Sequence, residues 1–118
     1  MTPLLFVAAA LAGGVGAALR HLADLAVARF AGRRFPWGIL LVNVTGSFAL
    51  GFATALVPDA YFLVGAGLLG GYTTFSTAMF DTVALWRNGE RPASVLNLLG
   101  TFALSIAAAL AGLLIAGA

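Results

Sequence analysis

Long stretches without any charged side chain are the feature that most restricts how this chain can fold. Four of them follow one another: Thr2–Leu19, Phe35–Val57, Ala60–Phe80 and Pro92–Ala118. A helix needs about 20 mainly apolar residues to cross the hydrocarbon layer of a membrane. Backbone exposed to lipid must satisfy its hydrogen bonds internally, as a helix does. We therefore predict an all-α membrane protein with four transmembrane helices in a single domain, residues 1–118.

The overall composition supports lipid rather than water as the solvent of this surface. Charged residues make up 8% of the chain, whereas soluble proteins carry roughly 25%. The net charge is +2, but the six basic residues are arginines placed between apolar runs. This placement favours a role in membrane topology over nucleic-acid binding. The chain has no cysteine and one histidine, His21, so we expect neither disulfides nor a Cys/His metal site.

The connections between the four runs differ in character. The charged segment Arg20–Arg34 predicts a short interfacial helix that ends at Gly32. A tight turn is expected around Pro58 and Asp59, and a polar loop over Arg87–Pro92. The apolar N-terminus lacks the basic start of a signal peptide, so we expect the first helix to be retained.

The third run contains the most informative segment, Gly70-Gly71-Tyr72-Thr73-Thr74-Phe75-Ser76-Thr77. Each of two adjacent glycines weakens a helix by about 1 kcal/mol relative to alanine. Hydroxyl side chains can bond carbonyls of their own helix, but four of them beside a glycine pair favour a break. Non-helical backbone at this depth must be buried in protein or line a cavity. We therefore predict a third helix broken near its middle, with free carbonyls that face a cation or water.

Two further polar rows lie within the predicted spans. One comprises Asn43, Ser47 and Gly51, and the other Asn97, Thr101 and Ser105. Residues four apart lie on one helix face, and an unpaired amide in lipid is costly. Each row must therefore face protein or a pore. The small residues Ala9, Gly13 and Ala17 form a row that favours close helix packing.

Acidic side chains are missing from the four charge-free runs, and this bears on the transport mechanism. A proton-coupled exporter usually needs an intramembrane carboxylate that exchanges a proton for its substrate. Passive conduction is therefore the favoured prediction, with a small-molecule exporter of the inverted-dimer type as an alternative. No nucleophile–base pair or phosphate-binding loop is recognisable, so we expect no enzymatic activity.

The chain resembles the Fluc fluoride channels, also called the CrcB family. Three segments carry the resemblance, and together they extend over nearly the whole sequence. They are Gly13-Gly14-Val15-Gly16-Ala17-Ala18-Leu19-Arg20, Trp37-Gly38-Ile39-Leu40-Leu41-Val42-Asn43-Val44-Thr45-Gly46-Ser47, and the Gly70–Thr77 segment.

The resemblance implies an antiparallel dimer with two narrow pores and a structural sodium ion at its centre. In the family, backbone carbonyls at the break of the third helix hold the sodium, and these correspond to Gly70 and Thr73. The implied fluoride-pore residues of this chain are Asn43, Thr74, Phe75, Thr101 and Ser105. Amides and hydroxyls can donate hydrogen bonds to fluoride, and aromatic rings have positive edges.

The implied function is a passive, fluoride-selective channel subunit that exports cytoplasmic fluoride and lowers its toxicity. Two departures from the family pattern affect this expectation. Ala78 stands where the family usually has a second phenylalanine, and Ile39 where it often has a threonine. They keep open the alternative of a non-conducting partner subunit in a heterodimeric channel.

The six arginines are distributed on one side of the predicted topology. Four lie in the connection after the first span and two in the connection after the third; they are Arg20, Arg29, Arg33, Arg34, Arg87 and Arg91. The positive-inside rule places both connections in the cytoplasm and both termini outside a cell membrane. This bias predicts one-way insertion and pairing with a related, oppositely oriented subunit, with the homodimer as the competing outcome.

Overall fold

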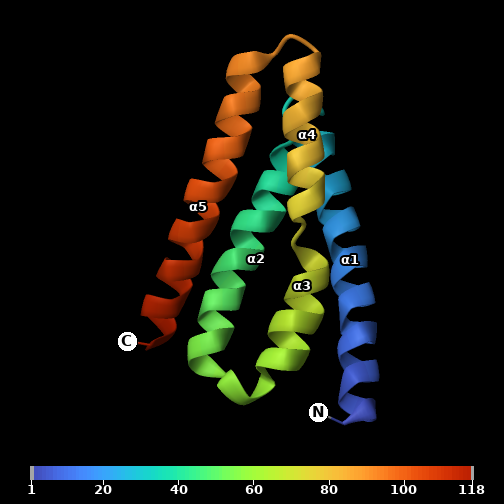
Figure 1. The fold of residues 1–118 in the computed structure, drawn as a ribbon, viewed down its shortest axis with the longest axis vertical. Coiled ribbons are helices and arrows are strands. Elements are labelled where there is room, and N and C mark those ends of the chain that lie inside the picture. The colour runs from blue at the N-terminus through green and yellow to red at the C-terminus, as the bar shows by residue number, and fades with distance from the viewer. Residues whose placement is uncertain (1, 118) are drawn as a thin grey trace.

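The computed structural model describes residues 2–117, and these form helices without any strand. Ala118, the last residue of the fourth predicted span, and Met1, the first residue of the predicted domain, lie outside the described residues. The elements are α1 (Pro3–Ala31), α2 (Trp37–Leu56), the 3-10 turn η1 (Pro58–Ala60), the π-helix η2 (Tyr61–Leu69), α3 (Gly70–Tyr72), α4 (Phe75–Arg87) and α5 (Arg91–Gly117). Figure 1 shows that η2, α3 and α4 follow one path, beside α1, α2 and α5.

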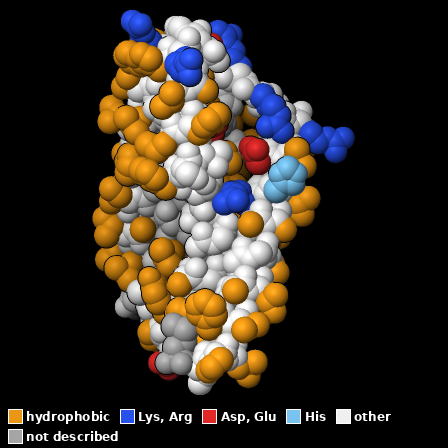
Figure 2. All heavy atoms as spheres, turned by 45° about the vertical axis from the view of Figure 1, so that its right-hand side comes forward, with side chains coloured by type: hydrophobic (Ala, Val, Ile, Leu, Met, Phe, Trp, Pro, Cys, Tyr) orange, Lys and Arg blue, Asp and Glu red, His pale blue; other side chains and the backbone are white. Residues whose placement is uncertain are grey.

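Three of these helices, α1, α2 and α5, are long and apolar enough to cross a membrane. The outer surface is rich in exposed large apolar side chains, such as Phe30 at 93% and Leu114 at 70%, and Figure 2 shows apolar atoms spread along this face. Soluble monomeric proteins rarely expose apolar side chains over so large an area. The fold is that of a multi-pass membrane protein.

The two polar connections lie at one end of the molecule, and the turn η1 and both chain ends lie at the other (Figure 1). This arrangement agrees with the predicted order of spans. At the polar end, Arg34 Nε donates to Glu90 Oε1 at 3.1 Å and so links the two connections. The pair is exposed, so we assign it little stability.

The first helix is longer than the predicted span. We expected it to close at Arg20 and to be followed by a separate interfacial helix, but α1 runs without interruption to Ala31. No glycine or proline lies between Leu19 and Gly32, so nothing stops the helix where the charges begin. The predicted end at Gly32 is confirmed, because this residue caps the helix with φ of 76°.

The third predicted span also ends later than expected. The charge of Asp81 predicts a boundary there, but α4 continues through Asp81 to Arg87. Helix propensity does not change at a single carboxylate, whereas Gly89, with φ of 83°, does end the helical path. The tight turn at Pro58 and Asp59 is confirmed as η1.

Small residues bring the helices close together, as the four-residue rows predict. A Cβ at Gly71 would collide with the carbonyl of Gly13, and one at Gly16 with the carbonyl of Leu68. In the same way, a Cβ at Gly51 would collide with the Ala109 carbonyl. The backbones of α1 and η2–α3, and of α2 and α5, therefore touch directly.

The helix pair α2–α5 provides a first prediction. A methyl group at Gly112 would collide with the Phe48 carbonyl oxygen, while nothing lies within 4 Å of a Cβ at Gly100 in the same helix. We expect Gly112→Ala to destabilise the fold by about 1–3 kcal/mol, the usual cost of overpacking. Gly100→Ala should be neutral or stabilise slightly, because alanine is the better helix former.

Unfolding in mixed micelles, followed by tryptophan fluorescence, measures both glycine variants. Equal stabilities of Gly112→Ala and Gly100→Ala would contradict the close approach of α2 and α5.

Candidate functional site

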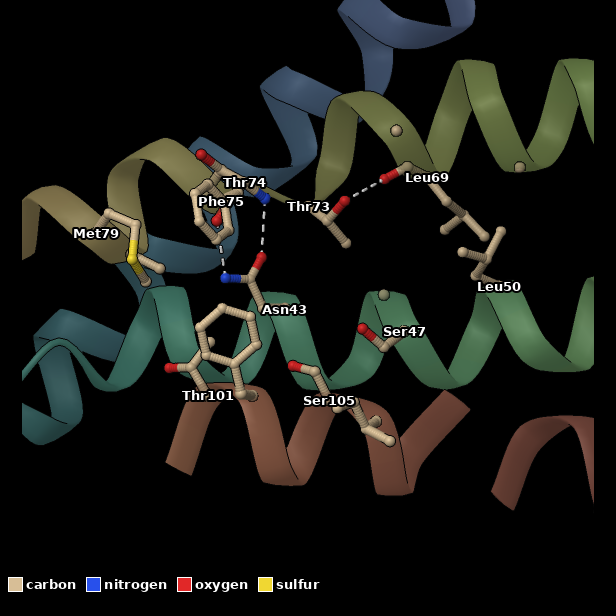
Figure 3. Close-up of a pocket in the computed structure, with 16 residues that line it drawn as sticks. Asn43, Ser47, Leu50, Leu69, Thr73, Thr74, Phe75, Met79, Thr101 and Ser105 are labelled. Atoms are coloured by element: carbon tan, nitrogen blue, oxygen red, sulfur yellow. Dashed lines mark hydrogen bonds between the residues drawn. The ribbon is translucent and has the colours of Figure 1, made fainter. Parts of the chain in front are cut away.

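The helical path is interrupted at Thr73 and Thr74, which both adopt extended backbone between α3 and α4. Asn43 of α2 supplies the hydrogen bonds that a helix would otherwise make there. Its Nδ2 donates to the Thr74 carbonyl at 2.9 Å, and its Oδ1 accepts from the Thr74 N–H at 2.8 Å. Figure 3 shows this reciprocal pair of hydrogen bonds between Asn43 and Thr74. The asparagine amide therefore stabilises the interruption.

Both threonines of the interruption also bond to neighbouring helices through their hydroxyls. Thr74 Oγ1 accepts from the Thr77 N–H at 3.2 Å and so caps the N-terminus of α4, a favoured role for threonine. Thr73 Oγ1 donates to the Leu69 carbonyl at 2.9 Å. The hydroxyls of Thr73 and Thr74 therefore stabilise the end of the helical segment before the interruption and the start of α4.

Arg20 of α1 contacts the opposite side of the interruption. Its Nη1 donates to the Gly71 carbonyl at 3.2 Å and lies 3.4 Å from the Thr73 carbonyl. The side chain is half-buried, so the charge-assisted bonds gain strength from limited solvent. Arg20 therefore serves the fold at the interruption and is separate from the arginines of the polar end.

A cavity of about 250 Å³ lies beside the interruption, between α2, η2, α4 and α5. Its wall contains every pore and cation residue predicted from the sequence, together with apolar side chains. The lining residues are Asn43, Gly46, Ser47, Leu50, Gly65, Leu69, Gly70, Thr73, Thr74, Phe75, Ala78, Met79, Thr101, Phe102, Ser105 and Ile106. None of these described residues carries a charge.

Two hydroxyls at this cavity have no partner. Thr101 Oγ1 and Ser105 Oγ are buried, and neither has a hydrogen-bond partner among residues 2–117. They project from α5 on the side of α2 and Asn43 (Figure 3). A buried hydroxyl without a partner costs about 1–3 kcal/mol, so these two groups would gain from donating hydrogen bonds to a ligand in the cavity.

The second polar row of the sequence is divided by the structure. Asn97 lies away from the cavity, where its Nδ2 donates to Thr82 Oγ1 at 2.9 Å. Ser94 Oγ donates to the Thr82 carbonyl at 2.6 Å. Asn97 and Ser94 are each 2% exposed, and their hydrogen bonds link α5 to α4. Thr101 and Ser105, in contrast, line the cavity.

Aromatic side chains form part of the cavity wall. The rings of Phe75 and Phe102 lie 6.0 Å apart, centroid to centroid, at an angle of 64°. Phe102 was not predicted as a site residue, because a phenylalanine in an apolar helix ordinarily indicates contact with lipid. Phe80 is 74% exposed and is not part of the wall, and Ala78 is buried in it.

A second, more polar cavity of about 270 Å³ lies at the arginine end. Ile39 and Thr77 line it together with Asp24, Arg33 and Asp81. Arg33 Nη1 lies 3.6 Å from Asp24 Oδ2. Thr74 Oγ1 donates to Thr77 Oγ1 at 3.0 Å, so a pair of bonded hydroxyls stands between this cavity and the one beside the interruption.

Comparison with known proteins gives a consistent result. The family described as CrcB-like protein, Camphor Resistance (CrcB), matches residues 7–113. The chain is 42% identical over 114 residues to Fluoride-specific ion channel FluC 2 of Mycobacterium tuberculosis (strain ATCC 25618 / H37Rv), a match that covers 95% of this chain and 90% of the relative. It is also 42% identical over 123 residues to Fluoride-specific ion channel FluC 1 of Leifsonia xyli subsp. xyli, covering 99% and 90%. With Fluoride-specific ion channel FluC of Shewanella denitrificans it shares 45% over 112 residues, covering 90% and 89%.

Proposed function

The chain belongs to the CrcB-like family, and we propose that it is a subunit of a passive, fluoride-selective ion channel in the cell membrane. Fluoride would leave the cytoplasm through the cavity beside the helix interruption. The relatives that bear the name Fluoride-specific ion channel match almost the full length of the chain.

The unpartnered hydroxyls of Thr101 and Ser105 support this proposal most directly. Fluoride is small and strongly hydrated, so a pore must offer hydrogen-bond donors in place of water. Hydroxyls and amides donate such bonds without adding charge. Asn43 supports the same reading, because only one of its two N–H donors has a partner among residues 2–117.

Passive conduction is sufficient for export by such a channel. HF crosses membranes as a neutral acid and ionises inside, which traps the anion. An inside-negative potential favours the exit of an anion by about 2.3 kcal/mol per 100 mV. The cavity wall has no carboxylate among the described residues, so it supplies no group for proton exchange. This disfavours the alternative of a small-molecule exporter.

Growth in fluoride tests the proposed function in cells. A strain that lacks fluoride export should grow at fluoride concentrations that otherwise inhibit it when it expresses this chain with any partner it requires. Rescue should be specific for fluoride. Rescue from a toxic organic cation instead would support the exporter.

A second subunit is part of this proposal. Phe75 belongs to the cavity wall and is nevertheless 66% exposed, so one subunit leaves the pathway open on that side. We propose that an oppositely oriented subunit closes it, as in the antiparallel dimers of the family. The partner is a related chain or a second copy of this one.

A structural sodium ion is the proposed cofactor of the dimer. Gly70 and Thr73 both line the cavity, and sodium prefers neutral or anionic oxygen ligands such as carbonyls. The Thr74 N–H, which would bond the Gly70 carbonyl in a continuous helix, donates to Asn43 instead. Arg20 binds the Gly71 carbonyl and reaches that of Thr73. The residues therefore fit a carbonyl-bound cation, most clearly at Gly70.

Valine at Gly70 tests the cation site. A Cβ added at Gly70 would meet only the Gly65 carbonyl oxygen, at 3.6 Å. The Cβ itself therefore does not clash within the subunit. We expect the parent dimer to dissociate more readily when a large organic cation replaces sodium, and Gly70→Val to lose this sodium dependence. Gly14→Val is the matched control, since nothing lies within 4 Å of its Cβ. A Gly70→Val dimer as stable and as sodium-dependent as the parent would argue against the site.

The orientation of the subunit is also a proposal. Arg20 binds backbone at the interruption, which leaves five arginines at the polar end, where Figure 2 shows the basic side chains gathered. We propose that this end faces the cytoplasm, by the positive-inside rule. The one-sided charge favours pairing with a related subunit that inserts the other way.

Reporter fusions measure the orientation directly. Two reporters are fused in turn to the C-terminus, one that is active only in the cytoplasm and one that is active only outside it. We expect activity from the second reporter alone. The control is the same pair of reporters inserted at Gly89, in the connection between α4 and α5, which should give the opposite pattern. Equal populations on both sides would defeat one-way insertion and favour the homodimer.

A further inference from the structure

We propose that Phe102 forms the second aromatic wall of the anion path and helps to select the ion that passes. This inference rests on the proposed function and adds a residue to its site. The ring is tilted by 64° against that of Phe75, with their centroids 6.0 Å apart, and both rings line the cavity beside the helix interruption.

The position of Phe102 on α5 places it next to the free donors. Thr101, Phe102 and Ser105 all line the cavity, and the hydroxyls of Thr101 and Ser105 have no partner among residues 2–117. On α4 the cavity wall opposite has Phe75 and the small side chain of Ala78. Phe102 is therefore the residue of α5 that supplies a ring to this wall.

Two tilted rings beside uncharged donors suit a dehydrated anion. The edge of an aromatic ring carries partial positive charge and its face partial negative charge. A pair at 64° can present an edge to an anion while the apolar surface excludes water. Larger anions gain less from such a contact, because their charge lies farther from the ring edge.

Phe102→Leu in reconstituted channels tests this role, in the assembly in which the parent chain conducts. We expect the fluoride flux to fall about three- to tenfold, the scale of one aromatic contact, and the ratio of fluoride to chloride flux to fall with it. Phe102→Tyr keeps the ring and should recover most of the lost flux. The matched control is Phe52→Leu, which removes a ring from the Phe48–Phe52 pair outside the cavity.

The outcomes separate this inference from the proposed function. A conducting parent whose flux and selectivity are unchanged in Phe102→Leu overturns the inference alone. An equal loss of flux in the leucine and tyrosine variants, with unchanged selectivity, also overturns it, because it would report packing. A parent that passes no fluoride with any partner overturns the proposed function and this inference together.

Discussion

Replacement of Asn43 by aspartate is expected to abolish fluoride flux. The change puts a negative charge at the cavity where the anion must pass. Two unit charges 4 Å apart repel by about 4 kcal/mol at an effective dielectric constant of 20, which slows passage on the order of a thousandfold. The initial rate of fluoride release from liposomes measures the effect.

The same substitution also affects the helix interruption. Asn43 Nδ2 donates to the Thr74 carbonyl, and a carboxylate cannot replace that donor. Some loss of stability is therefore expected, so the dimer must be verified by size-exclusion chromatography. Asn88→Asp makes the same chemical change in the exposed connection at the polar end and should leave flux intact. An assembled Asn43→Asp channel with a flux within tenfold of the parent would contradict the assignment.

Replacement of Phe75 by isoleucine is expected to lower fluoride flux about tenfold or more, through loss of a ring edge at the path. Isoleucine retains an apolar side chain but has no ring to pair with Phe102. Phe80→Ile is the matched control, because Phe80 lies on the same helix and outside the cavity. The two variants are compared by fluoride release from liposomes at equal protein content. Equal rates would remove Phe75 from the pathway.

The spans could be predicted from the sequence because charge and apolarity are local properties. The runs predicted for α2 and α5 agree with the helices to within two residues at each described end. The end predicted for the first span at Arg20 is wrong, because no helix-breaking residue follows Arg20 before Gly32. Arg20 lies among apolar residues because carbonyls of a distant segment, Gly71 and Thr73, accept its charge-assisted bonds. A charge in a membrane segment thus need not mark its end.

The candidate site was only partly visible in the sequence. Hydroxyls at four-residue spacing indicated Thr101 and Ser105, but the same spacing included Asn97, which is bound to Thr82 instead. The reciprocal bonds between Asn43 and Thr74 join residues 31 positions apart. Phe102 has no local signal that distinguishes it from the other phenylalanines of the chain. Sequence patterns predict which faces are polar, whereas tertiary packing decides which polar groups remain unpartnered.

Ion release from liposomes that contain this chain, alone and with a matched, oppositely oriented partner, tests directly whether the pore is selective for fluoride. A potassium ionophore balances the charge, and ion-selective electrodes record fluoride and chloride separately. We predict rapid fluoride release through at least one of the two assemblies and far slower chloride release. Equal release of both anions, or no fluoride release from either assembly, would contradict a fluoride-selective pore.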